Sequence, residues 1–118
     1  MNTQLDQLKT LNHNTIIELV GDEPAKIQKF HTEFLKQSSV ILRTIIQSFN
    51  IDDFSEIKSQ AHFLKTSAKA VGAERSAYFL ETIESYSLER DKAAIKQVII
   101  KLNSEFNAIK KELTHDQH

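Results

Sequence analysis

Residues 57–73 read IKSQAHFLKTSAKAVGA, and the spacing of their apolar side chains decides how this chain folds. An α-helix turns by about 100° per residue, so residues three or four apart share one face. On that wheel five apolar residues form a single stripe: Ile57, Ala61, Leu64, Ala68 and Val71. His62 lies well away from the centre of this stripe, in an outward column with Lys58, Lys65, Thr66 and Lys69. The spacing therefore predicts an amphipathic helix that turns a histidine outward.

The same helical spacing recurs along most of the chain. Only two Gly and one Pro interrupt 118 residues, which favours long helices over strands and tight turns. We expect four long helices: three over about residues 24–49, 54–70 and 74–86, and a fourth about 35 Å long whose apolar residues run from 95 to 113. A loop is expected at 87–90, and Gly72 is expected to end the helix that carries His62.

Polar residues at the expected breaks predict where helices begin. Asp22 precedes Pro24 and is the expected N-cap of the first long helix. Asp53 and Glu56 have the spacing of a capping box for the second. Nearer the N-terminus, Asn14 is the expected cap of a short helical turn over residues 15–20.

Four helices with one apolar stripe each are buried most simply as an antiparallel bundle. We therefore predict an all-α fold: an antiparallel four-helix bundle with an additional short N-terminal helix, whose apolar face is Leu5, Leu8 and Leu11. A single domain over residues 1–118 is expected, with the bundle core at about 22–113 and a polar, frayed tail at 114–118. Because no helix has a spare apolar seam, we expect a monomer.

Composition and charge exclude several classes of protein. The formal net charge is −1, from 15 basic and 16 acidic residues, so the basic excess typical of nucleic-acid binding is missing. The chain has no Cys, which excludes disulfides and thiolate metal sites and fits a reducing compartment. No apolar run approaches the roughly 20 residues that cross a bilayer, and the polar start is not a signal peptide. We expect a cytoplasmic protein that binds neither membrane nor nucleic acid.

The stretch around the histidine carries a family resemblance. Residues 62–68, HFLKTSA, followed by VGA at 71–73, resemble the signature of histidine-containing phosphotransfer (HPt) domains. That signature reads His-x-Leu-Lys-Gly-Ser-Ala/Ser, and then an apolar residue, Gly and often Ala. Segments 21–34 and 80–84 and the chain length are also similar to the family layout.

The resemblance implies a four-helix bundle that carries a phosphoryl group on an exposed histidine. In such domains the group comes from a receiver-domain aspartyl phosphate and passes to another receiver aspartate. The expected partners are therefore the receiver domains of a hybrid sensor histidine kinase and of a response regulator. The resemblance implies a phosphocarrier and not an enzyme, with no kinase or phosphatase activity of its own. It also implies no cofactor or metal on this chain, since Mg²⁺ belongs to the receiver.

The resemblance also assigns roles to residues. His62 is the phosphoacceptor at Nε2, Lys65 supports the phosphoryl group, and Gly72 is the helix stop. Local chemistry agrees, because neutral imidazole is a competent nucleophile and Lys65 brings positive charge one turn away. Lys58 and Lys69 lie on the same face, where they either support the phosphate and steer docking or simply form a solvated surface.

Two positions depart from the family pattern. Thr66 stands where the family usually has Gly, and its larger side chain narrows partner choice, slows transfer or is simply tolerated. Glu84 stands where some members have a Gln that hydrogen-bonds the histidine. An ionised carboxylate would accept from Nδ1–H, leave the Nε2 lone pair free and make the imidazole more basic. The alternative for Glu84 is an ordinary exposed helix residue.

Two functional hypotheses follow from the sequence. The first is a phosphorelay intermediate that uses His62. The second is a non-catalytic helical adaptor that binds a receiver or another partner without phosphotransfer, and Thr66 keeps that alternative open. A di-metal bundle needs two Glu-x-x-His pairs and further carboxylates, whereas Glu112 and His115 form one pair.

Overall fold

The structure is a computed structural model of the chain, and it describes residues 3–115. These residues form helices and no strand: α1 (Thr3–Gln7), α2 (His13–Val20), α3 (Pro24–Asn50), α4 (Phe54–Ala70), α5 (Glu74–Glu89) and α6 (Lys92–His115). Across the described residues, none of these helices is long and apolar enough to cross a membrane.

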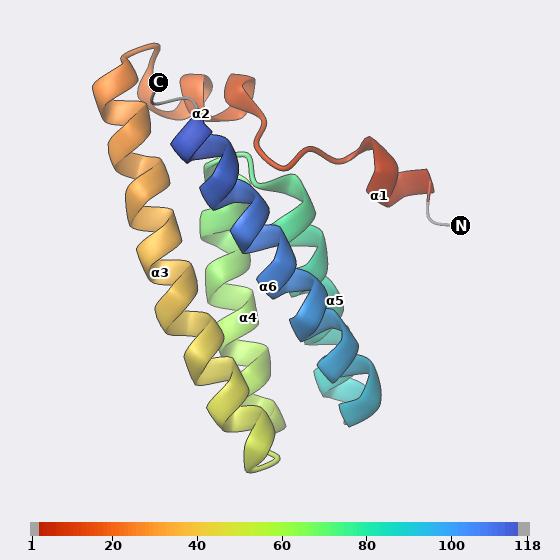
Figure 1. The fold of residues 1–118 in the computed structure, drawn as a ribbon. Helices are drawn as coiled ribbons and strands as arrows, with labels where there is room; N and C mark the ends of the chain where they lie inside the picture. The colour runs from red at the N-terminus through yellow and green to blue at the C-terminus, as the bar shows by residue number, and fades with distance from the viewer. Residues whose placement is uncertain (1–2, 116–118) are drawn as a thin grey trace.

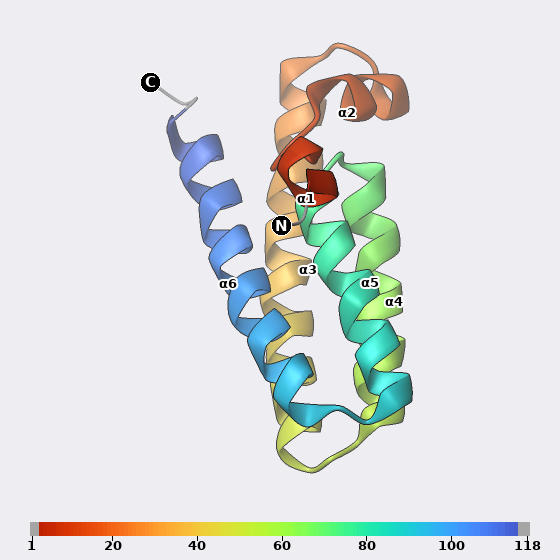
Figure 2. The same cartoon turned by 90° about the vertical axis from the view of Figure 1, so that its right-hand side faces the viewer.

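Helices α3 to α6 form the predicted antiparallel four-helix bundle (Figure 1). Each helix packs beside the next one along the chain, and α4 and α5 pack together most extensively. The contact between α3 and α6 closes the bundle and is the least extensive of the four. Figure 2 shows the reason, because α6 leans away from the other helices toward its C-terminal end.

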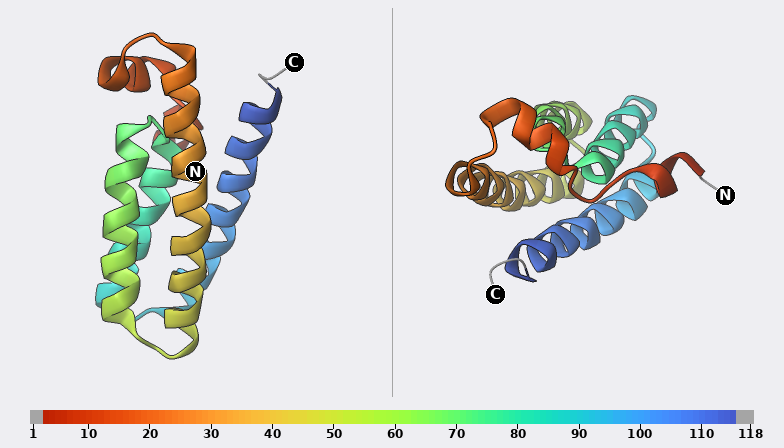
Figure 3. Two further views of the ribbon diagram at one scale, coloured as in Figure 1. Left: turned by 90° about the vertical axis from the view of Figure 1, so that its left-hand side faces the viewer. Right: turned by 90° about the horizontal axis from the view of Figure 1, so that it is seen from above.

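Two short helices precede the bundle, where the sequence predicted a short helix through Leu5, Leu8 and Leu11 and a helical turn over residues 15–20. Helix α1 ends at Gln7, so Leu8 and Leu11 lie beyond it and that part of the prediction is wrong. Helix α2 lies across the end of the bundle, over the start of α3 and the end of α4 (Figure 3). Asn12 caps α2, since its side-chain oxygen accepts a hydrogen bond from the Asn14 backbone N–H at 3.1 Å. The expected cap at Asn14 is therefore wrong, and the helix begins at His13. This earlier start gives α2 eight residues and makes it an element of its own.

Polar contacts anchor the N-terminal segment to the bundle. Arg75 on α5 donates from Nη1 to the Leu5 carbonyl oxygen at 3.0 Å and from Nε to Glu105 Oε1 on α6 at 3.2 Å. Glu74 beside it accepts from the backbone N–H of Lys9 at 2.9 Å. The N-terminal segment is therefore attached to α5 by hydrogen bonds as well as by its apolar side chains.

The apolar stripe of residues 57–71 is the centre of the core. Each of its five members is at most 4% exposed, as the helical wheel predicted. Ser38 on α3 interrupts the apolar pattern and is nevertheless buried, because its hydroxyl donates to the Phe34 carbonyl oxygen at 2.7 Å. A satisfied hydroxyl can occupy a core position without breaking the helix.

Helix α4 has the predicted bounds and the predicted ends. Asp53 caps its start by accepting from the Glu56 backbone N–H at 3.1 Å. Gly72 follows its end with a φ of 80°, a conformation that favours glycine. The Gly72 carbonyl also accepts from the Asn12 N–H at 2.8 Å, and a Cβ at Gly72 would overlap the Asn12 backbone. Gly72 is therefore both the predicted helix stop and the site of a close backbone approach that the sequence did not reveal.

Other helix ends differ from the prediction. Glu23, and not Asp22, is the N-cap of α3. Helix α5 continues to Glu89 through part of the expected loop, because buried Ser87 donates to the Ile83 carbonyl oxygen at 2.7 Å and the chain turns only at Arg90, where φ is 56°. Helix α6 includes Thr114 and His115, so the first part of the expected frayed tail is helical, whereas residues 116–118 lie outside the described residues.

Candidate functional site

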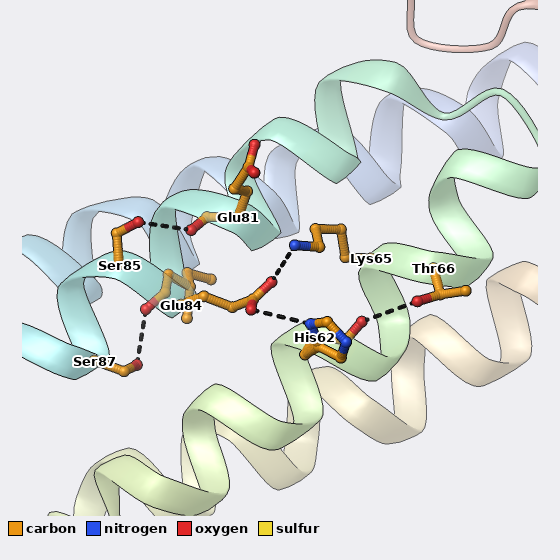
Figure 4. Close-up of polar contacts among 8 residues, drawn as sticks. His62, Lys65, Thr66, Glu81, Glu84, Ser85 and Ser87 are labelled. Atoms are coloured by element: carbon orange, nitrogen blue, oxygen red, sulfur yellow. Dashed lines mark hydrogen bonds and ion pairs between the residues drawn. The ribbon is translucent and has the colours of Figure 1, made fainter.

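His62 lies on the outer surface of α4 (Figure 4). Burial of the apolar stripe against the neighbouring helices sets the rotation of α4 about its axis, and this rotation turns His62 toward solvent. Its side chain is 65% exposed. The prediction of an accessible, outward-facing histidine on a rigid helix is confirmed.

Glu84 reaches from α5 and connects two residues of α4 (Figure 4). Its Oε2 lies 3.1 Å from His62 Nδ1, and its Oε1 lies 2.8 Å from Lys65 Nζ. An ionised carboxylate can only accept, so the first hydrogen bond requires a proton on Nδ1 and leaves Nε2 with a free lone pair. The predicted contact between Glu84 and His62 is present, and it involves the ring nitrogen that was expected.

Lys65 is not where the helical wheel placed it. The wheel grouped Lys65 with the outward residues, but its side chain is 15% exposed because the ion pair with Glu84 draws the ammonium toward α5. Lys58 and Lys69 are exposed, and neither forms an ion pair within residues 5–114. Among the three lysines, the structure joins only Lys65 to the histidine, through a shared carboxylate.

Thr66 is exposed one turn after His62. Its hydroxyl donates to the backbone carbonyl oxygen of His62 at 3.4 Å, which is a long hydrogen bond to its own helix. Its β-branched side chain therefore adds exposed bulk on α4 beside His62.

Beside the histidine is an apolar hollow that sequence reasoning missed. Phe63 is 56% exposed and lines a hollow of about 560 Å³ between α2, α3 and α4. Leu19, Phe30 and Val40 line the same hollow and are also strongly exposed. Phe30 belongs to the apolar pattern of α3, and periodicity alone could not show that it lies at the edge of the buried face. The signal that was available was Phe63, an apolar residue outside the stripe and next to His62.

His13 and His31, the other histidines whose side chains the structure describes, do not contribute to this site. The rings of His13 and His31 meet edge to face, 6.3 Å apart, near the end of the bundle that α2 covers. Within the described part of the chain, no three side chains of the metal-binding types His, Cys, Asp and Glu are grouped to hold an ion.

Comparison with known proteins gives a family match and a shared fold. The model of the Hpt domain family matches residues 29–114. Among solved structures, the chain is similar to histidine-containing phosphotransfer protein B (HptB) from Pseudomonas aeruginosa PAO1, with a TM-score of 0.82 and 16% identity over 91% of this chain and 93% of that one. A rice protein assigned as a histidine-containing phosphotransfer protein has a TM-score of 0.81 and 16% identity, over 95% of this chain and 89% of that one. No curated protein sequence matches significantly.

Proposed function

Because the chain belongs to the Hpt domain family, whose members carry phosphoryl groups on histidine in phosphorelays, we propose that His62 is its phosphoacceptor. His62 takes the group from a receiver-domain aspartyl phosphate and passes it to the aspartate of another receiver. The two receivers belong to a hybrid sensor histidine kinase and to a response regulator.

One observation carries this proposal. His62 is 65% exposed, and its Nδ1 is held by Glu84, so the opposite ring nitrogen is left for chemistry. A nucleophile must present a lone pair to the incoming group, and a rigid helix reduces the entropy lost in aligning it. An ordinary surface histidine would have no carboxylate on a neighbouring helix to select its tautomer.

Phosphoryl transfer to His62 requires no proton to leave the imidazole ring. The Nε2 lone pair attacks phosphorus while the P–O bond to the receiver aspartate breaks, and the electron pair of that bond returns to the carboxylate. The Nδ1 proton stays in place, so the product is a phosphoimidazolium. Transfer to the second receiver reverses these steps and releases neutral imidazole. The receiver supplies the aspartate and Mg²⁺, and this chain supplies the nucleophile.

The surface beside the histidine supports the docking of a protein partner. Exposed apolar groups that gather in a hollow are typical of interaction sites. Phe63 brings this hollow to the position next to the acceptor, and Lys58 and Lys69 add positive charge on α4. A receiver that docks here would bury apolar surface and place its aspartyl phosphate near Nε2.

The test is phosphoryl transfer from a phosphorylated receiver domain. We expect wild-type protein to take up label in an adduct that is labile in acid and stable in base, and we expect His62→Gln to take up none. His13→Gln removes another exposed histidine, which lies on a different helix, α2, and serves as the matched control. Uptake by His62→Gln would refute the site assignment. A wild-type protein that binds receivers but accepts no phosphate would be an adaptor.

A further inference from the structure

We propose that a groove between α3 and α6 binds an acidic amphipathic helix of a partner protein. His62 lies where α4 meets α5, since it contacts Glu84, so this groove is on the opposite side of the bundle. The inference goes beyond phosphotransfer and does not rest on it, because it concerns a second surface with chemistry of its own.

The charges of the chain are divided unevenly between its helices. Of the 15 basic residues nine lie on α3 and α6, and of the 16 acidic residues only three do. The formal net charge of −1 therefore conceals a basic pair of helices in an otherwise acidic chain. One of the three acidic residues, Glu105, is buried and pairs with Arg75 on α5, so its charge does not face α3.

A groove of about 280 Å³ lies between the two basic helices. The contact between α3 and α6 is the least extensive in the bundle, and α6 leans away from α3 toward its C-terminal end (Figure 2). Leu35, Leu42 and Phe106 line the groove from the core side and make its floor apolar. Its rim consists of exposed polar and basic side chains: Lys36, Ser39, Asn103, Asn107 and Lys110. Among the described residues, no acidic side chain lines it.

Positive charge continues along both helices beyond the groove. Arg43 follows Lys36 by about two turns on α3, and Lys96 precedes Lys110 by about four turns on α6. All four side chains are exposed, and within the described residues none of them forms an ion pair. Between Lys96 and Lys110 the basic stripe is about 20 Å long, at 1.5 Å per residue.

An acidic amphipathic helix fits both the charge and the floor of this surface. A helix of three to four turns has about the length of the basic stripe. Its apolar residues, at helical spacing, would pack on the apolar floor, as in other complexes of a helix in a groove. Its Asp and Glu side chains would meet the lysines on both rims, and such complementary charge speeds association and selects the partner.

Other anionic partners use this surface less completely. Nucleic acid would contact the cations through its phosphates, leave the apolar floor unused and meet repulsion from the acidic remainder of the chain. A small free anion would likewise gain nothing from the floor that Leu35, Leu42 and Phe106 provide. The combination of an apolar floor with a basic rim therefore favours an acidic protein segment.

An occupied groove would leave His62 accessible. The apolar hollow beside Phe63 lies on the α2 and α4 side of α3, whereas the groove lies on its α6 side, and Lys36 on the ridge between them lines both. A receiver and the acidic helix would therefore bind the same molecule. A partner held at α3 and α6 would keep this chain near a receiver by raising its effective concentration.

Fluorescence anisotropy with labelled synthetic peptides tests the proposal. The probe is a helical peptide of about four turns, with Leu on one face and Glu on the other. One control peptide has the same composition with the Leu positions scrambled, and another has Lys in place of Glu. We expect the amphipathic acidic peptide to bind the full chain at least about 10-fold more tightly than the scrambled one, and the Lys peptide not to bind.

Variants of the rim locate the binding site. Lys110→Glu and Ser39→Glu should each weaken binding of the acidic peptide about 10-fold, because each places a carboxylate in the groove. Both positions are exposed, and circular dichroism checks that the variants fold. Lys58→Glu makes the same charge reversal at an exposed position of α4 and is the matched control, with an expected change below about 2-fold. Lys36 is left unchanged because it also lines the hollow.

A second readout is the ¹⁵N spectrum of the protein on addition of the peptide. The side-chain amide signals of Asn103 and Asn107 should shift, whereas the ring signals of His62 should not. The proposal is overturned if the scrambled peptide binds equally well, or if Lys58→Glu weakens binding as much as Lys110→Glu does. Tighter binding of single-stranded RNA or of anionic lipid vesicles than of the acidic peptide would also overturn it, and would assign the basic face to that class of partner.

Discussion

Glu74 and Glu84 lie on the same helix, α5, and each joins two partners with its two carboxylate oxygens. Glu74 accepts from the Lys9 backbone N–H and from Asn12 Nδ2, both at 2.9 Å. Glu84 pairs with Lys65 and His62. The partners of Glu74 are amide groups that neither titrate nor exchange a proton, so that cluster fastens the N-terminal segment. Glu84 faces an exposed ring with two tautomers, so the same carboxylate geometry would orient the nucleophile that we propose.

The hydrogen bonds at Glu74 lower its pKa. The side chain of Asn12 and then the backbone of Lys9 stabilise the ionised carboxylate and lower the pKa of Glu74, against a smaller opposing effect of burial. Glu74 also lies in the first turn of α5, where a helix favours negative charge. Ionised Glu74 therefore stabilises the folded state, whereas ionised Glu84 is expected to assist phosphoryl transfer by orienting His62.

The largest effect on stability should come from a substitution at Gly72, two residues before Glu74. Gly72→Ala should lower the free energy of unfolding by about 2–4 kcal/mol, because it combines a strained positive φ with a clash against the Asn12 backbone. Urea denaturation measures this. Gly21→Ala is the comparison variant: its φ of 85° and ψ of 172° lie in a region almost restricted to glycine, but a Cβ there meets nothing within 4 Å, so about 1–3 kcal/mol of backbone strain is expected without a clash. Equal losses in the two variants would show that the approach of Asn12 to Gly72 contributes nothing.

Replacing each of the two glutamates with alanine tests the comparison directly. Glu74→Ala should lower the free energy of unfolding by about 1–2 kcal/mol, since hydrogen bonds to a charged group are lost at a partly exposed position, and should leave phosphoryl uptake unchanged. Glu84→Ala should slow uptake about 10-fold and lower the free energy of unfolding by less than about 1 kcal/mol. Denaturation and label uptake, measured on both variants, check the pair. The comparison fails if Glu74→Ala slows transfer as much as Glu84→Ala does.

Lowering the pH should reduce the contribution of Glu74 to the free energy of unfolding. Because the folded-state pKa of Glu74 lies below the usual 4.5, its contribution to stability is complete above that pH and is lost as the pH falls through the lower value. The free energy of unfolding of wild type should therefore exceed that of Glu74→Gln near pH 6, and the difference should shrink below about pH 4.5. A difference that grows on acidification would contradict this sign.

The smallest effect is expected at Thr66, one turn after His62. Thr66→Gly should lower the free energy of unfolding by about 0.5 kcal/mol through helix propensity. It should also speed phosphoryl uptake about 2- to 3-fold, because removal of an exposed branched side chain next to His62 eases the approach of a receiver. Thr66→Ala, which keeps a Cβ and restores propensity, separates the two contributions. Slower uptake in Thr66→Gly would show that the threonine assists transfer.

Periodicity and motif predicted much of the site. The bounds of α4, the burial of its stripe, the exposure of His62 and the contact of Glu84 with Nδ1 all follow the expectations drawn from residue spacing and family resemblance. These features depend on the faces of single helices, or on a position already known from the family pattern. The functional roles of these residues stay predictions: His62, Glu84, Lys65, Thr66, Lys58 and Lys69.

The sequence by itself determined which residues form helices, which face of each is buried and that a histidine points outward, because local backbone geometry repeats every 3.6 residues whatever the helix packs against. Only the tertiary structure decided that Lys65 turns inward to Glu84, that Asn12 approaches Gly72, and that Phe30 joins Phe63 at an exposed hollow. Those contacts depend on the offset and rotation of one helix against another. That geometry is set by how all the core side chains interlock, and no helical wheel contains it.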